Sequence, residues 1–304
     1  MRRHHVTRLD PATLAVPADH DGHCRGFGRV AHVDGSEGSV HTGFATCELQ
    51  PGGELADHVH SYEESFYVLS GAAELTVDGR TVRVTGADCG LVAVGAPHRW
   101  RNGGDAPVRW LEMSSPTPRA AGSGAPPDTF WVPAAPDQDA IELDIRDPRT
   151  RGFFRLGPDQ MDVDQLKLGA QVEAPTVSAS MATALLAYSG IAVKMLVDER
   201  LGAALHNMFM VEYQAGGVAH PHDHPLEETY YMLEGSVEFV ADGETYDLGP
   251  GDVAWAGVGC VHAFYHRSGP RPRWLETQAP LPPRAHSYRF NRDWDYLQSA
   301  LEGT

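Results

Sequence analysis

Short runs in which apolar and polar residues alternate recur along the chain, and they predict β-strands. Two such runs flank Asp78-Gly79, and two more flank Asp242-Gly243. Asp-Gly between alternating runs favours a tight hairpin, because a type I′ turn needs positive φ at both central residues. A further strand pair is expected at 191–197 and 205–211. The pattern predicts an all-β chain with short helical segments. For 294–301, a tail packed across a barrel or against another subunit is favoured over a short helix.

The same residues recur at a constant offset of 164, which is the separation of His58 from His222. No insertion interrupts this register from about Gly52 to Glu112. The identical pairs at this offset are His58/His222, Glu64/Glu228, Gly71/Gly235, Asp78/Asp242, Asp88/Asp252, His98/His262 and Trp110/Trp274. Two copies of one unit of domain length are the economical explanation.

We therefore expect two tandem domains, 1–118 and 151–304, each with its own metal site, joined by a linker at 119–150. The stretch 114–137 is rich in Pro, Ala, Gly and Ser, which is the composition of a linker. Within it, Phe130-Trp131-Val132 is apolar and is expected to pack on one of the domains.

Composition and charge narrow the class of protein. The 32 glycines and 22 prolines among 304 residues favour many short strands. A net charge of −17 repels phosphate backbones and anionic lipid, so we expect no nucleic-acid or membrane partner. The four cysteines form no CxxC pair, which favours reduced thiols in a cytoplasmic protein without a signal peptide. The most apolar stretch, 181–197, is too short and interrupted to span a bilayer.

The first copy contains a candidate metal site. His58 and His60 are two residues apart, so on a strand both point to the same face. Glu64 opens the next predicted strand, and a β-barrel can bring the distant His98 to the same interior. Buried without partners, each of these groups would cost about 1–3 kcal/mol, a penalty that a divalent cation removes. The second copy repeats the set as His222, His224, Glu228 and His262.

The donor set restricts the cation. Three imidazoles and one carboxylate, without thiolate, suit one divalent transition metal per barrel: Fe, Mn, Ni, Cu, Co or Zn. Four protein ligands leave an octahedral ion about two open positions for water, dioxygen or substrate. The acidic neighbours are expected to be solvated or to orient imidazoles: Asp57, Glu63, Asp223 and Glu227.

These motifs resemble those of the cupin superfamily. Residues 53–71 resemble the first cupin motif, and 86–102 resemble the second. The later copy departs at Val261 and His266, where the family usually has Pro and Asn. The resemblance implies a bicupin, that is, two tandem jelly-roll (double-stranded β-helix) barrels, and it implies a homo-oligomer, a dimer or larger.

Apolar and aromatic residues are expected to surround the ligands, a pattern typical of a pocket for a small organic substrate. The predicted pocket residues are Phe66, Trp100, Tyr230, Trp255, Phe264 and His266. The second copy has the richer set of such neighbours, which slightly favours it as the active barrel.

The favoured function is a non-heme dioxygenase that acts on a metal-chelating small organic compound, aromatic or enediol. Quercetinase-like bicupins resemble the chain in ligation, and by that analogy Glu64 or Glu228 acts as the catalytic base. Redox-neutral metal catalysis remains open: a decarboxylase, an isomerase, a lyase or a ureidoglycine aminohydrolase-like hydrolase. Oxalate decarboxylase-like chemistry needs an inward arginine, for which the pattern offers no candidate. A non-enzymatic metal or small-molecule binding protein is the third alternative.

Overall fold

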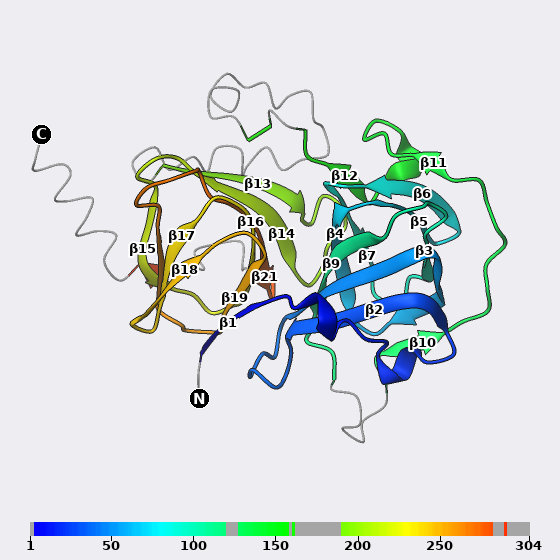
Figure 1. Ribbon diagram of the computed structural model, residues 1–304, viewed down its shortest axis with the longest axis horizontal. Helices are drawn as coiled ribbons and strands as arrows, with labels where there is room; N and C mark the ends of the chain where they lie inside the picture. Colours follow the sequence, from blue (N-terminus) through cyan, green and yellow to red (C-terminus); the bar gives the residue numbers. More distant parts are fainter. Residues whose placement is uncertain (1–2, 120–126, 158–159, 162–189, 282–288, 291–304) are drawn as a thin grey trace, which may run out of the picture.

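The computed structural model describes residues 3–119, 127–157, 160–161, 190–281 and 289–290. They form two β-barrels that lie side by side, and the only helices in these ranges are three short 3-10 turns (Figure 1). The predicted all-β fold of two tandem barrels with short helical segments is confirmed. No helix in these ranges is long and apolar enough to cross a membrane. The segment 294–301, expected to be a packed tail or a short helix, lies outside the described residues.

The first barrel is built around one long strand that bends between its two faces. This strand is β3, and the sheet order is β6-β5-β8-β3-β9-β4-β7, with β2 also paired to β3. The bounds are β2 (Cys24–Val33), β3 (Gly43–His60), β4 (Glu63–Ser70), β5 (Ala72–Val77), β6 (Arg80–Thr85), β7 (Asp88–Val92), β8 (His98–Arg101) and β9 (Val108–Ser115).

The second barrel repeats this topology in two separate sheets, β19-β16-β21-β14-β13 and β18-β17-β20-β15-β22. Here two strands, β14 and β15, take the place of the single β3. The bounds are β13 (Ile191–Val197), β14 (Asn207–Tyr213), β15 (Val218–Asp223), β16 (Glu227–Glu234), β17 (Val237–Ala241), β18 (Glu244–Leu248), β19 (Asp252–Ala256), β20 (His262–Tyr265), β21 (Arg273–Ala279) and β22 (Arg289–Phe290).

Both predicted hairpins are confirmed. Asp78 and Gly79 have φ of 49° and 72°, and Asp242 and Gly243 have φ of 47° and 88°. Positive φ at both central positions is the signature of a type I′ turn, which glycine and aspartate tolerate better than bulky residues. The strand pair expected at 191–197 and 205–211 is present as β13 and β14.

The strand that precedes each copy pairs with the other copy's barrel. β1 (His4–Arg8) lies antiparallel to β19 of the second barrel, and β12 (Phe153–Arg155) lies antiparallel to β7 of the first (Figure 1). The registers are equivalent, since Arg8 is opposite Asp252 and Arg155 is opposite Asp88. The expected domains, 1–118 and 151–304, divide the chain by sequence order. Strand pairing crosses that division, because β1 joins the second barrel and β12 joins the first.

The expected linker also carries ordered structure. It contains β10 (Thr129–Trp131), β11 (Ile141–Glu142) and the 3-10 turn η3 (Pro148–Thr150). β10 pairs with the end of β3, with Thr129 opposite His60 and Trp131 opposite His58. The apolar stretch that was expected to pack on a domain therefore lies against the first barrel.

Three clusters of buried apolar side chains make up the core. One fills the first barrel and includes Leu75, Val82 and Trp100, and a second fills the other barrel. The third lies between the barrels, where side chains of β3 and β9 meet those of β14 and β21: Phe44, Leu111, Met113, Met208, Met210 and Leu275. The Phe44 and Tyr231 rings, 6.3 Å apart, bridge this interface.

Two buried glutamates tie the barrels together, which corrects the expectation that they are solvated. The Glu227 carboxylate accepts hydrogen bonds from the backbone N–H groups of residues 40, 41 and 42, at 2.9–3.1 Å. The Glu63 carboxylate accepts from residues 204, 205 and 206, at 2.7–3.2 Å. Oε1 of Glu63 also lies 2.9 Å from Nδ1 of His206. Each carboxylate thus caps a loop of the opposite copy, so burial at 1–2% exposure is compensated.

Candidate metal centres

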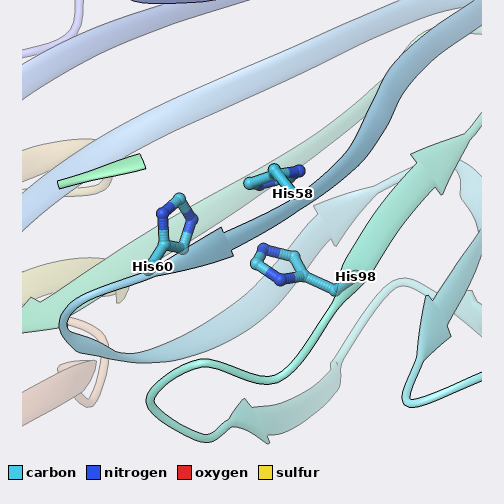
Figure 2. Close-up of side chains that lie close together, drawn as sticks. All are labelled: His58, His60 and His98. Atoms are coloured by element: carbon cyan, nitrogen blue, oxygen red, sulfur yellow. The ribbon is translucent and has the colours of Figure 1, made fainter. Parts of the chain in front are cut away.

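The first candidate centre lies inside the first barrel. β3 supplies His58 and His60, and β8, paired with β3 so that His98 is opposite His58, supplies the third ring. Figure 2 shows the three imidazoles facing one another. One donor atom of each lies within 4.8 Å of the others, and all three rings are buried.

The far side of each ring is held in place. The Nδ1 atoms of His58 and His98 lie 2.7 and 3.0 Å from the carbonyl oxygens two residues before them. The Nδ1 atom of His60 lies 3.1 Å from Oγ1 of Thr129, on β10. A carbonyl only accepts, so the two Nδ1 atoms beside carbonyls carry hydrogen, and the Nε2 lone pairs are left for the centre.

Burial keeps these rings neutral. It lowers the pKa of His58 to about 3 and that of His60 to about 4, and it lowers the pKa of His98 well below its usual value. Oε2 of Glu64 lies 3.1 Å from Nε2 of His60 and 3.7 Å from Nε2 of His98. Three neutral imidazoles and one carboxylate converging out of water fit a divalent transition cation, which needs deprotonated ligands.

The second centre has the same plan. Donor atoms of His222, His224 and His262 lie within 4.8 Å of one another, and each Nδ1 lies 2.7–3.0 Å from a backbone carbonyl. Oε2 of Glu228 is 2.8 Å from Nε2 of His224 and 3.2 Å from Nε2 of His262. All four predicted ligands of each copy are thus brought together.

In the second centre the carboxylate and the imidazoles shift one another's pKa values. Burial acts to raise the pKa of Glu228, but the attraction and hydrogen bonds of His224 and His262 outweigh it, so the pKa is well below normal. Burial acts to lower the pKa of His224, and Glu228 reverses that effect. Burial dominates at Glu64, whose pKa is raised well above its usual value.

Two residues that bond to Glu228 also differ between the copies. In the second centre the Tyr230 hydroxyl donates a short hydrogen bond to Oε2 of Glu228 and lies 3.1 Å from Nε2 of His262. Gln278 Nε2 donates to the other carboxylate oxygen at 2.6 Å. In the first copy these positions are Phe66 and Ser114, which offer Glu64 neither bond.

A cavity of about 490 Å³ opens on the first centre. Its wall contains all four ligands of that centre and three large aromatic side chains, Tyr62, Trp100 and Trp110. The remaining polar lining includes His20, Arg29, Glu112, Arg119, Asp128 and Thr129. The expectation that the second barrel is the active one, drawn from aromatic neighbours alone, does not locate this cavity.

An ion pair forms part of that lining. Arg29 on β2 donates to Oε1 of Glu112 on β9 from Nε at 3.1 Å and from Nη2 at 2.8 Å. Burial acts to raise the pKa of Glu112, but Arg29 outweighs it and holds that pKa at about 2. Strand register makes Val193 the second-copy equivalent of Arg29, since they pair with the matched residues Val211 and Cys47. The inward arginine therefore belongs to the first barrel alone.

The predicted pocket residues are divided among several environments. Trp100 lines the cavity, and Phe66 packs edge-on against it in the barrel core. In the second barrel Phe264 lies edge-on to Tyr230, beside the centre. His266 bonds through Nδ1 to the carbonyl of Gln214, 3.0 Å away.

Trp255 requires a correction. Its neighbours on β19, Ala254 and Ala256, pair with Tyr230 and Glu228 and share their inward face. Alternation along a strand turns Trp255 to the opposite face, and it lies in the core between the barrels. Its aromatic character was a correct sign of burial, but not of a pocket.

Several cavity residues escaped sequence reasoning. Glu112 did show a signal, because it matches Glu276 at the repeat offset. Arg29 lies before the ungapped register and is replaced in the other copy, so the repeat gave no sign of it. Thr129, in the expected linker, could be placed beside His60 only by the long-range pairing of β10 with β3.

Comparison with known proteins agrees with this geometry. The family model described as Cupin domain matches residues 45–114 and 209–277. The chain is 39% identical over 70 residues to polyketide synthase CurC of Streptomyces cyaneus, a match covering 22% of this chain and 45% of CurC. It is 28% identical over 107 residues to tetracenomycin polyketide synthase protein TcmJ of Streptomyces glaucescens, covering 34% and 72%. The chain thus spans less than half of the CurC sequence.

Among solved structures, the chain resembles salicylate 1,2-dioxygenase from Pseudoaminobacter salicylatoxidans with gentisate, with a TM-score of 0.67 and 15% identity over 91% of this chain and 81% of that one. The G106A mutant of that enzyme with gentisate gives a TM-score of 0.65 at 16% identity, over the same shares. At such identities the likeness is one of fold. The family match in both barrels, with a buried three-histidine cluster in each, identifies the chain as a bicupin of the cupin superfamily.

Proposed function

We propose that this bicupin is a metal-dependent dioxygenase whose first barrel acts on a small organic anion able to chelate the metal. The observation that carries the proposal is the cavity of about 490 Å³ on the first centre. Ligand pockets usually measure about 300–1,000 Å³ and combine apolar walls with a few polar groups. This cavity has both features, and its size suits a ring compound.

The polar groups of the cavity favour an oxygen-rich or anionic ligand. Arg29 donates from Nε and Nη2 to Oε1 of Glu112, and this pair places a guanidinium in the cavity wall. The indole Nε1 of Trp110 is buried and has no hydrogen-bond partner within the described residues. Its second-copy equivalent, Trp274, donates to Glu276 at 3.0 Å. We therefore assign Arg29 and Trp110 as the donors that orient the substrate.

The chain's own residues then perform three tasks. His58, His60, His98 and Glu64 would hold a divalent transition metal, which supplies open positions for substrate oxygens and dioxygen when bound. Glu64 has no donor from Tyr or Gln, unlike Glu228, so its carboxylate is placed to take a proton from a substrate hydroxyl. Tyr62 and Trp100 exclude water from the wall. The gentisate found with the dioxygenase of similar fold is a hydroxylated aromatic acid, which suggests that class of substrate.

The second centre is proposed to stabilise its barrel rather than to turn over substrate. The Tyr230 hydroxyl lies within hydrogen-bond distance of Glu228 and His262, two of the four donors. It therefore occupies space beside the centre that a substrate oxygen would need.

Matched ligand variants test this assignment. His58→Ala and His222→Ala each remove one donor from one centre, and both proteins would be assayed with ortho-hydroxylated aromatic acids. Oxygen uptake should disappear in His58→Ala and persist in His222→Ala, with metal content measured for both. Loss of oxygen uptake in a folded His222→Ala protein that retains metal in the first centre would contradict the choice of barrel.

Redox-neutral chemistry on a polyketide is a second candidate, favoured by the similarity to CurC and TcmJ. In that reaction Glu64 would remove a proton from an acidic carbon or hydroxyl while the metal stabilises the anion. Turnover under strict exclusion of oxygen distinguishes the two: it would support this candidate and rule out dioxygenation.

A further inference from the structure

A third cluster of potential metal ligands lies at one end of the second barrel, outside both four-residue centres. It consists of His4, Asp242 and Cys260, one ligand atom of each lying within 4.8 Å of the others. His4 is the first residue of β1, Asp242 lies in the β17–β18 turn, and Cys260 precedes β20. Three distant parts of the chain thus meet at one point.

His4 is the member whose surroundings point to a ligand. Its ring is 3% exposed, and Nε2 lies 2.9 Å from the hydroxyl of Tyr246. Nδ1 is buried and finds no hydrogen-bond partner in the part of the chain that the structure describes. Leaving such an atom unsatisfied is unfavourable, and a bound cation would satisfy it.

Asp242 supplies an oriented carboxylate with a path to solvent. Its Oδ1 accepts from Arg3 Nη2 at 2.9 Å and from the Val261 N–H at 3.1 Å, while Oδ2 accepts from Arg3 Nε at 3.0 Å. These bonds fix the group beside Cys260, and its side chain remains 22% exposed. A cation can therefore enter from this side.

Cys260 gives the cluster a donor that neither barrel centre has. Its side chain is 1% exposed, and its thiol lies 4.0 Å from the Val261 carbonyl oxygen. The first barrel has Asp78 in the equivalent turn but Ala96 in place of the cysteine. The nitrogen, oxygen and sulfur set is thus particular to the second barrel.

We propose that His4, Asp242 and Cys260 form a third metal site, one that takes a thiophilic divalent cation such as Zn²⁺. Imidazole, carboxylate and thiolate are all zinc ligands, and a tetrahedral ion would keep its fourth position for water on the Asp242 side. Binding replaces the thiol proton, which is released to solvent, so no oxidant or reductant is needed.

The position of the site gives it a structural consequence. β1 and β12 each pair with the barrel of the other copy, and we call them the exchanged arms. His4 is the first residue of β1 that pairs with β19. An ion held by His4 and by two residues of the second barrel would fasten the arm, and ligand binding to the folded state raises stability by mass action.

Cobalt titration of the metal-free full-length protein tests the proposal, because thiolate-to-cobalt charge transfer reports sulfur ligation and neither barrel centre contains sulfur. We expect a third equivalent of Co²⁺ to bind and to produce this near-ultraviolet band. Cys260→Ser should lose the band and the third equivalent while keeping the other two. Cys89→Ser removes a buried thiol outside the cluster and should keep the band.

If Cys260→Ser folds poorly, His4→Gln provides a second test, because it removes a different ligand of the same site. It should weaken Co²⁺ binding at the third site at least tenfold and abolish the rise in melting temperature that Zn²⁺ gives the wild type beyond two equivalents. A wild-type protein that shows no charge-transfer band, or a band that survives in both Cys260→Ser and His4→Gln, would overturn the proposal.

Discussion

Single side chains decide how alike the two centres are. The eight ligands are matched pair by pair, yet Phe66 replaces Tyr230 and Arg29 replaces Val193 in equivalent positions. The Tyr230 hydroxyl has no counterpart beside the first centre, and Arg29 adds a guanidinium to the wall of the first barrel's cavity. Matched ligand sets thus lie in different polar surroundings.

Arg29→Met is predicted to destabilise the protein by about 2 kcal/mol, because Glu112 would lose both of its bonds to Arg29 inside the barrel. Urea unfolding measures the loss. Adding Glu112→Gln removes the unpaired charge, so the double variant should recover part of the stability. If Arg29→Met unfolded at the wild-type urea concentration, the ion pair would contribute nothing.

A pH effect is predicted at His32, which is buried and has Nε2 2.8 Å from Thr46 Oγ1. Burial lowers the pKa of His32 from 6.5 to about 4. Protonation is therefore easier in the unfolded chain, so this contribution to stability is complete above pH 6.5 and is lost as the pH falls towards 4.

His32→Gln should remove that dependence and flatten the stability curve by up to about 1.4 kcal/mol per pH unit between pH 6.5 and 4. Urea unfolding of both proteins at matched metal content provides the measurement. Parallel curves for wild type and variant would show that His32 does not titrate on unfolding.

At the scale of elements, the exchanged arms are the main feature. β1 and β12 occupy equivalent edges and end in equivalent ion pairs, Arg8 with Asp252 and Arg155 with Asp88. An arm that covers the edge of the other barrel removes an exposed strand edge from each. It also makes the folding of each barrel depend on residues from the other half of the chain.

The two arm arginines should differ in strength. The Asp88 side chain is fully buried and that of Asp252 is 15% exposed, while Arg8 itself is 62% exposed. Arg155→Ala should therefore cost about 2 kcal/mol and Arg8→Ala less than about 1 kcal/mol, both measured by urea unfolding. Equal losses would mean that burial of the aspartate does not set the strength of the pair.

At the scale of the whole molecule, the barrels form one body with an approximate two-fold relation. An apolar core fills the interface, and the reciprocal carboxylate caps at Glu63 and Glu227 flank it. Each cap satisfies three backbone N–H groups of the other copy. The arrangement resembles a dimer of single barrels joined into one chain.

Glu227→Ala should lower the free energy of unfolding by about 3 kcal/mol, because the N–H groups of residues 40–42 lose their acceptor. Glu227→Gln keeps one carbonyl acceptor and should lose less. Since Glu228 is adjacent, elemental analysis must show that the second centre keeps its metal. Equal unfolding curves for the Ala and Gln variants would contradict the capping role.

Some features were determined by the sequence alone because they are local or periodic. The Asp-Gly hairpins follow from backbone preferences at two adjacent residues, and the offset of 164 relates every ligand to its copy. Spacing of two and four residues around His58 and Glu64 was enough to name the donors, since a strand places alternate residues on one face.

Other features were decided only by the tertiary structure, because they depend on which distant segments meet. Arg29 reaches the cavity through the pairing of β2 with β3, and His4 reaches Cys260 through an arm that crosses to the other barrel. Trp255 faces the interface because of its register on β19. Periodicity specifies which face of a strand is buried, but not which neighbour buries it, and that neighbour sets the chemistry of each centre.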